Sequence, residues 1–176
     1  ASVISAVFAV FVGVAAAAGS KRVDVFINWV IDIVMGVPHT ILVILISFAM
    51  GRGLKGLLVG IAATHWCSLA RLIRGEVLQL RSMQYVAVSR KLGKSGGWIL
   101  AHHLLPHLGP QFLVGLVLMF PHAILHEASV SFLGFGLPPE QPAIGIILSE
   151  SMRYIGAGMW WPAVLPGLTL VLIVLL

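Results

Sequence analysis

The sequence predicts an all-α protein, a polytopic bundle of transmembrane helices with about five spans. Hydrophobic residues make up 59% of the 176 residues and charged residues only 10%, whereas soluble domains carry roughly 25% charged residues. The hydrophobic residues gather in long runs that polar or glycine-rich stretches separate. Lipid cannot hydrogen-bond the backbone of such runs, so helices are the structure we expect them to adopt.

Five apolar runs are predicted to be spans because a helix needs about 20 apolar residues to cross a bilayer. In chain order they cover residues 2–18, 28–50, 57–73, 108–130 and 160–176, and Pro38 is expected to bend the second gently. The first is short for a span unless it begins upstream, and we expect the sequence to be a piece of a longer chain with both ends missing. The first run also lacks a preceding basic stretch, which argues against a signal peptide.

Two long loops separate the later runs of what we expect to be one domain over residues 1–176. The loop 74–107 lies between the third and fourth runs and is strongly basic. The loop 131–159 follows the fourth run and is rich in glycine and proline, with a short amphipathic helix predicted over 144–154. Asp32, in the second run, is expected to pair with a neighbouring helix.

The basic residues predict the orientation, because loops rich in Lys and Arg stay on the cytoplasmic side. Placing the stretch from Arg71 to Lys94 inside also places Lys21 and Arg22 inside. That arrangement has eight basic residues inside and leaves three outside, namely Arg52, Lys55 and Arg153. The net charge of +5 is explained by this asymmetry, so it does not indicate nucleic-acid binding.

Two short helices are predicted inside the basic loop. Tyr85–Leu92 has helical composition and Gly93 follows it, as a glycine does at a helix C-terminus. A second helix over Trp98–Leu105 is expected to stop at Pro106. An ordinary helical loop of a membrane protein would explain the same features.

The spacing of these residues resembles the EAA loop of ABC importer permeases. In that family the loop reads Glu-Ala-Ala, three residues, Gly, nine residues, Ile-x-Leu-Pro. Here Gly93, Leu105 and Pro106 fall on the family positions. The segments Arg74–Arg81 and Ser131–Gly136 also resemble the dipeptide, oligopeptide and nickel importer branch.

The sequence departs from the family pattern at the polar and aliphatic positions. Ala87 stands in place of the Glu, Val88 and Ser89 in place of the Ala pair, and His103 in place of the Ile. These departures remove any polar contact of the Glu and leave the shape of the loop unchanged.

The resemblance implies a MetI-like permease of a type I ABC importer, a multi-pass protein of the bacterial inner membrane. It implies a second permease subunit, two cytosolic ATPase subunits that use the ATP, and an extracytoplasmic binding protein as partners, with no cofactor in this chain. The residues implied to couple to the ATPase are Tyr85, Ala87, Ser89, Arg90, Lys91, Gly93, Leu105 and Pro106. Their basic members would also serve simply as the charge that keeps the loop inside.

Two catalytic motifs are excluded. Gly93-Lys94-Ser95 lacks the glycine that a phosphate-binding loop needs five residues earlier, where Val88 stands. His126-Glu127 begins a zinc-protease motif, but Val130 occupies the position of its second histidine. The single cysteine excludes an internal disulfide. The chain is therefore not expected to be an enzyme.

Two histidines in the fourth run are candidate substrate-pathway residues. His122 and His126 are four residues apart, so they share a helical face, on which Met119 also lies. Ionisable residues in spans often mark a pathway, and imidazole suits nickel, copper and zinc. A neutral pair that hydrogen-bonds across helices is the alternative. His39 is a further candidate to line the pathway, although a lone histidine in a span is more often a packing or hydrogen-bonding group.

The predicted substrate follows from a further resemblance. His122-Ala-Ile-Leu-His126 resembles nickel permeases, in which two histidines occupy these positions, and His65-Trp66 resembles them too. The resemblance implies that Met119, His65, His122 and His126 line the substrate pathway, with His122 and His126 as transient metal ligands. The segment Glu127–Ser129 resembles peptide-importing members instead. Nickel or a metal chelate is the favoured substrate, a dipeptide or oligopeptide the alternative, and a stand-alone metal channel or secondary carrier a third interpretation.

Overall fold

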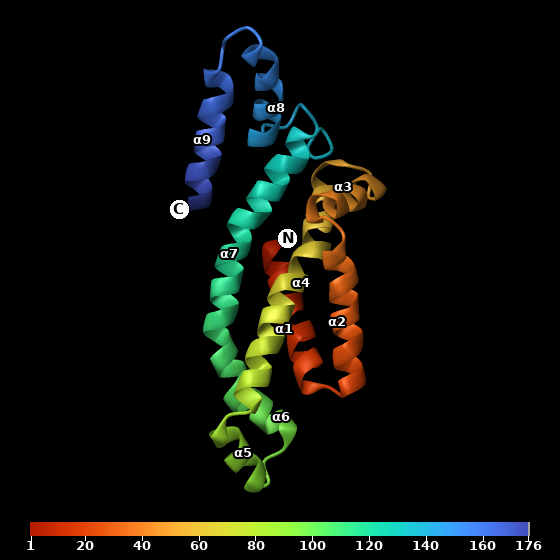
Figure 1. Cartoon of the computed structure of the whole chain (residues 1–176), viewed down its shortest axis with the longest axis vertical. Helices are drawn as coiled ribbons and strands as arrows, with labels where there is room; N and C mark the ends of the chain where they lie inside the picture. The colour runs from red at the N-terminus through yellow and green to blue at the C-terminus, as the bar shows by residue number, and fades with distance from the viewer. Residues whose placement is uncertain (176) are drawn as a thin grey trace. The chain divides into compact units, whose positions relative to one another are not determined.

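A computed structural model describes residues 1–175, and every regular element in that range is a helix (Figure 1), as predicted. The helices are α1 (Ser2–Ala18), α2 (Lys21–Gly36), α3 (His39–Ala49), α4 (Gly53–Arg81), α5 (Gln84–Lys91), α6 (Gly96–Ile99), the π-helix η1 (Leu100–Leu104), α7 (Leu105–Phe132), α8 (Ile144–Ile155) and α9 (Trp161–Leu175). The amphipathic helix expected in the loop 131–159 is α8.

Fewer helices than predicted are long and apolar enough to span a membrane. Within the described residues, α4 and the continuous helical stretch Gly96–Phe132 meet both conditions, and α2 with α3 would add a third as one broken span. The expectation of about five spans is thus not met by length and composition. The helices α1 and α9 have 17 and 15 residues. At 1.5 Å per residue they fall short of a hydrocarbon core of about 30 Å. The predicted end of the last span, Leu176, lies outside the described residues.

The predicted span 28–50 is interrupted, not gently bent. Helix α2 begins earlier, at Lys21, and ends at Gly36, and α3 starts after Pro38, which is its N-cap with φ −52° and ψ 122°. Proline lacks the N–H that would continue the helix, and it disfavours helical geometry in the residue before it. Val37 and Pro38 therefore separate two helices.

The described chain divides into two compact units by the packing of its helices. One unit contains residues 1–2, 37–64 and the chain from 118 onward, and the other contains 3–36 and 65–117. Both long helices, α4 and α7, contribute a part to each unit.

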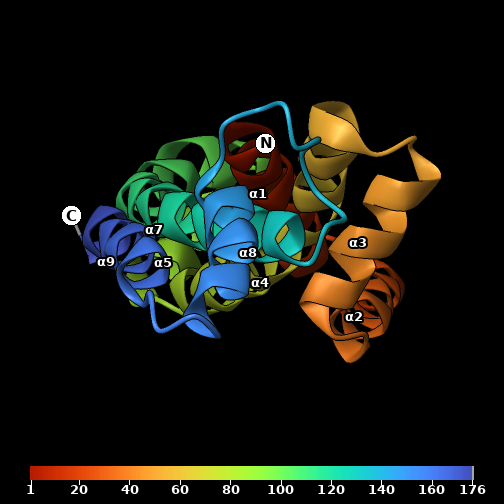
Figure 2. The same cartoon turned by 90° about the horizontal axis from the view of Figure 1, so that it is seen from above.

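The first unit has a small apolar core between α3, α4 and α7. Val43, Leu57, Ile61 and Val130 are its buried members. Gly60 allows the approach, because a Cβ there would lie 3.0 Å from the carbonyl oxygen of Val43. In the same unit α8 and α9 form a hairpin of neighbouring helices (Figures 1 and 2).

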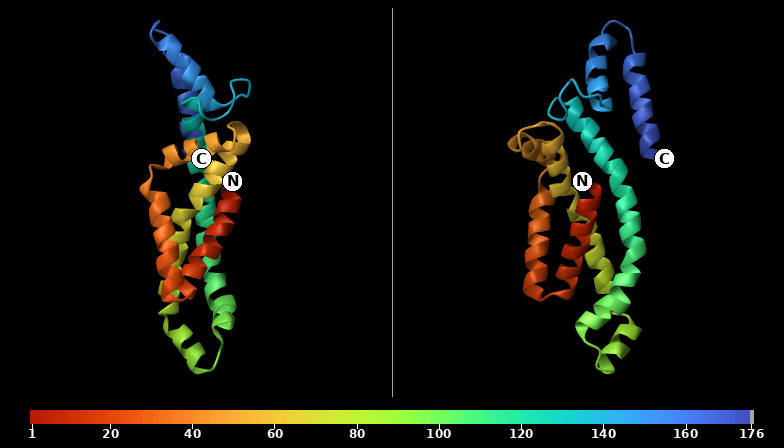
Figure 3. Two further views of the ribbon diagram at one scale, coloured as in Figure 1. Left: turned by 90° about the vertical axis from the view of Figure 1, so that its right-hand side faces the viewer. Right: turned by 180° about the vertical axis from the view of Figure 1, so that it is seen from behind.

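The second unit packs α1 and α2 against α4. The helices α1 and α2 run antiparallel and side by side (Figures 1 and 3). Gly13 brings α1 close to α4, since a Cβ at Gly13 would lie 2.6 Å from the carbonyl oxygen of Ala70. The Phe8 and Trp66 rings meet edge to face at 5.2 Å.

Two ion pairs join α2 to α4 in this unit. Arg74 donates to both carboxylate oxygens of Asp24, at 2.5 and 2.7 Å, and each side chain is about a quarter exposed. Arg71 pairs with Asp32 at 2.6 Å in a more exposed position. The second pair confirms the expected pairing of Asp32 with a neighbouring helix.

Candidate functional site

The segment between α4 and α7 is the first candidate site, and it lies wholly within the second unit. It folds as α5, a turn, α6 and the π-helix, drawn in green at the end of α4 in Figures 1 and 3. Helix α5 ends as predicted at Gly93, whose φ is +77°. The N–H of Gly93 bonds Arg90 O and that of Lys94 bonds Ser89 O, the pattern of a Schellman motif. The turn therefore needs glycine at this position.

The two faces of α5 differ. Val86 is fully buried and anchors the helix to the rest of the unit. Ala87, Arg90 and Lys91 are exposed, and Leu92, just past the helix, is 73% exposed. An anchored helix that presents basic and apolar side chains outward is a surface suited to contact another protein.

Ser89, by contrast, points inward. Its hydroxyl oxygen lies 2.9 Å from Nε2 of His103. The Tyr85 ring also contacts this histidine, with ring centroids 5.3 Å apart. The sequence showed that Ser89 and His103 both depart from the family pattern, but it gave no sign that they bond to each other.

The second predicted helix of the loop does not stop at Pro106. Helix α6 continues into the π-helix, where the Leu105 N–H donates to Leu100 O, five residues earlier. Helix α7 then begins at Leu105 and runs on through Pro106. Proline has no N–H for an α-helical bond, and the hydrogen-bond pattern changes in the wide turn just before it.

Ser95 has a structural role. Its hydroxyl accepts a hydrogen bond from the Trp98 N–H at 3.3 Å and caps α6. The Lys94 ammonium lies 4.7 Å from the centre of the Trp98 ring, a cation–π contact.

The second candidate site is a group of histidines in the first unit. The His39 and His126 rings are 4.4 Å apart between centroids, and the His122 and His126 rings are 5.9 Å apart. His39 Nε2 also lies 3.3 Å from the Thr64 hydroxyl. Helices α3 and α7 thus bring three imidazoles together.

His39 was expected to line the pathway or to be a packing or hydrogen-bonding group, and its contact with Thr64 agrees with the second expectation. Its approach to His126 was not predicted, because nothing in its neighbourhood along the chain indicates that α3 faces α7. The other predicted pathway residues differ in their exposure and in the unit to which they belong. Met119 is buried at 8% exposure, and His122 is exposed. His65 is buried and belongs to the second unit.

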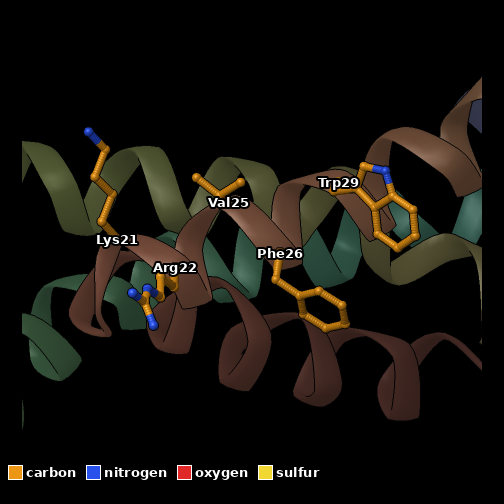
Figure 4. Close-up of a pocket in the computed structure, with 5 residues that line it drawn as sticks. All are labelled: Lys21, Arg22, Val25, Phe26 and Trp29. Atoms are coloured by element: carbon orange, nitrogen blue, oxygen red, sulfur yellow. The ribbon is translucent and has the colours of Figure 1, made fainter.

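An exposed groove runs along α2 in the second unit (Figure 4). Lys21 and Trp29 lie at its two ends, and Arg22, Val25 and Phe26 line it between them. Basic residues beside exposed aromatic rings are typical of a membrane–water interface. The groove therefore agrees with the predicted cytoplasmic placement of the start of α2.

The predicted orientation can be checked with single cysteines. Lys21→Cys and Lys55→Cys, each in a Cys67→Ala background, place one thiol at an exposed position. We expect a membrane-impermeant maleimide to label Lys55→Cys in intact cells and Lys21→Cys only in inside-out vesicles, because basic loops stay inside. Labelling of Lys21→Cys in intact cells would contradict this orientation.

The chain matches the family described as binding-protein-dependent transport system inner membrane component over residues 9–176. It is 32% identical over 158 residues to the dipeptide transport system permease protein DppC of Bacillus subtilis, covering 90% of this chain and 49% of that protein. It is 32% identical over 172 residues to the oligopeptide transport system permease protein OppC of the same organism, covering 89% and 56%. The oligopeptide transport system permease protein AmiD of Streptococcus pneumoniae is also 32% identical over 175 residues, covering 98% and 56%. The chain thus spans about half the length of these relatives.

Proposed function

Because the chain belongs to the family of binding-protein-dependent transport system inner membrane components, we propose that it is the permease subunit of an ATP-driven peptide importer. The family description names a multi-pass inner-membrane transport component, which agrees with the expectation that the chain is not an enzyme. In this proposal it forms half of a translocation pathway with a second permease subunit. Two cytosolic ATPases would supply the energy, and an extracytoplasmic binding protein would deliver the substrate.

The observation that carries the proposal is the helix α5. It is anchored by Val86 and presents Ala87, Arg90 and Lys91 to solvent. In the proposed importer this face contacts the ATPase, and the basic side chains meet acidic groups there. Gly93, Leu105 and Pro106 hold the turn and the start of α7 that connect α5 to the membrane helices.

A peptide is the better supported substrate. The relatives carry dipeptide and oligopeptide transport in their names, whereas nickel was favoured from the resemblance of the histidine segments to nickel permeases. The backbone and termini of a short peptide offer hydrogen-bonding groups that imidazole and hydroxyl side chains satisfy. A dipeptide or oligopeptide, first given as the alternative to nickel, is therefore the substrate that we propose.

A metal chelate remains a second candidate because of one observation. His39 joins His122 and His126, so that three imidazoles lie close together in one unit. Imidazole nitrogen is a good ligand for nickel, copper and zinc. Such a group would contact a metal as cargo during its passage.

Uptake by the full-length protein, assembled with its partner subunits in cells, separates these substrates. We expect dipeptide uptake in the wild type, retained to within about fivefold in His122→Ala and His126→Ala, the effect of losing one neutral hydrogen bond. His102→Ala is the matched control, since that ring lies in the loop, where it bonds the Trp98 carbonyl of the preceding turn and stacks on the Trp98 ring. Expression of each variant is measured alongside.

The opposite pattern would contradict a peptide substrate. Nickel uptake that both pathway variants abolish, without dipeptide uptake by the wild type, would make the histidines part of a metal pathway. Uptake of either substrate without any ATPase subunit would instead support a stand-alone channel or secondary carrier.

A further inference from the structure

The two hydrogen bonds of the Ser89 hydroxyl determine which ring nitrogen of His103 carries the proton. The Ser89 hydroxyl lies 2.9 Å from the carbonyl oxygen of Tyr85, which can only accept. The single hydroxyl proton is therefore donated to that carbonyl. The serine oxygen must then accept from His103, so the proton of this ring is on Nε2.

Rings on both sides hold His103 in place. Tyr85 of α5 meets its edge, and Trp98 of α6 lies 5.3 Å away in a T-shaped arrangement. Tyr85 also stacks on His107 at 6.0 Å, and the Nδ1–H of His107 donates to the His103 carbonyl at 2.7 Å. These contacts join one turn of α5 to the π-helix and the first turn of α7.

We propose that Ser89 and His103 are a matched pair of positioning residues that hold α5 against the start of α7. In the family pattern both positions are apolar, an Ala and an Ile. In this chain both have changed, and the two polar side chains satisfy each other. The pair forms a directed hydrogen bond, through which a displacement of α5 passes to α7.

The effect of this pair on transport rests on the proposed function, because a displacement of α5 matters to transport only if an ATPase moves that helix.

The two single substitutions differ in the hydrogen-bonding groups that they leave unsatisfied. Ser89→Ala leaves the Nε2–H of a half-buried ring without its acceptor, whereas His103→Ile leaves Ser89 still bonded to Tyr85. Making both changes restores the apolar pair of the family, with no polar group left unsatisfied.

The test is a double-mutant cycle in proteoliposomes that contain the full-length permease with its partner permease and ATPases, with the binding protein supplied on the side from which it delivers the substrate. ATP hydrolysis and dipeptide uptake are measured for Ser89→Ala, His103→Ile and the double variant. We expect the uptake per ATP hydrolysed to fall about two- to tenfold in Ser89→Ala, as for one lost hydrogen bond. The double variant should return to within about twofold of the wild type, because the two changes are coupled.

Ser82→Ala is the matched control. Its hydroxyl donates to Gln79 O of the adjoining turn, so its loss should leave the uptake per ATP unchanged. Unchanged coupling in Ser89→Ala, or a double variant as impaired as the product of the two single effects, would overturn the proposal.

Hydrogen exchange of the purified permease provides a measurement that does not depend on transport. The amides of α5 should exchange faster in Ser89→Ala and return towards the wild-type rate in the double variant. Equal exchange in all variants would overturn the proposal even if uptake changed. A wild-type complex without ATP-dependent uptake would refute the proposed function, while the exchange data would still decide whether the pair holds α5.

Discussion

Replacing Arg74 by alanine is expected to destabilise the protein by about 2 kcal/mol. Removing one partner of a buried ion pair costs roughly 3–5 kcal/mol, and the partial exposure of this pair reduces the effect. Arg74 makes two hydrogen bonds to Asp24, and both side chains are about three-quarters buried. The loss leaves a carboxylate between α2 and α4 that keeps its hydrogen bond from the Asn28 amide. In thermal unfolding of the full-length protein in detergent, Tm should fall by about 4–8 °C.

The second ion pair of the same helices is the matched control. Arg71 and Asp32 are joined by a single contact, and their side chains are 45% and 67% exposed. Arg71→Ala should therefore cost at most about 1 kcal/mol. A double variant Asp24→Ala/Arg74→Ala should recover part of the loss, since no lone charge remains. Equal losses of Tm for Arg71→Ala and Arg74→Ala would show that burial does not set the strength of these pairs.

Gly13→Ala is expected to destabilise the second unit by about 1–3 kcal/mol, the usual cost of overpacking. The added Cβ would lie 2.6 Å from the backbone oxygen of Ala70 and 2.9 Å from Cβ of Ile73. Neither atom is the free end of a flexible side chain, so α1 and α4 must move apart. Thermal unfolding measures the change.

Gly75→Ala should have the opposite sign. Apart from its chain neighbours and its own helix backbone, no atom of residues 1–175 lies within 4 Å of a Cβ added there. Alanine is also favoured over glycine in a helix interior by about 1 kcal/mol. A stabilised Gly13→Ala variant would mean that α1 and α4 are not in close contact at this glycine.

The features that the sequence predicted correctly depend on residues close together in the chain. The helix before Gly93 and the amphipathic helix α8 follow from composition and from a glycine that adopts positive φ. The all-α fold follows from the long apolar runs. Asp32 was expected to find a partner because a charge within an apolar helix needs one, and Arg71 is that partner.

The features that it missed depend on contacts between distant segments. The approach of His39 to His126 requires α3 to lie against α7, which no local pattern encodes. The bond between Ser89 and His103 depends on how α5 folds back on the next helix. The full interruption at Pro38 was underestimated, because proline bends some helices and ends others according to their surroundings.

The π-helix changes which residues of α6 and α7 lie on the same side of the continuous helix. A π turn holds about one residue more than an α turn, and one residue turns an α-helix by about 100°. The faces of α6 and α7 are therefore out of phase, although Gly96–Phe132 is continuous. Deleting Ala101, within the π-helix Leu100–Leu104, would restore a regular helix and rotate α6, with Trp98, to a different side of α7. A one-residue gap at this place in an alignment would thus mark a change in the direction that the loop faces.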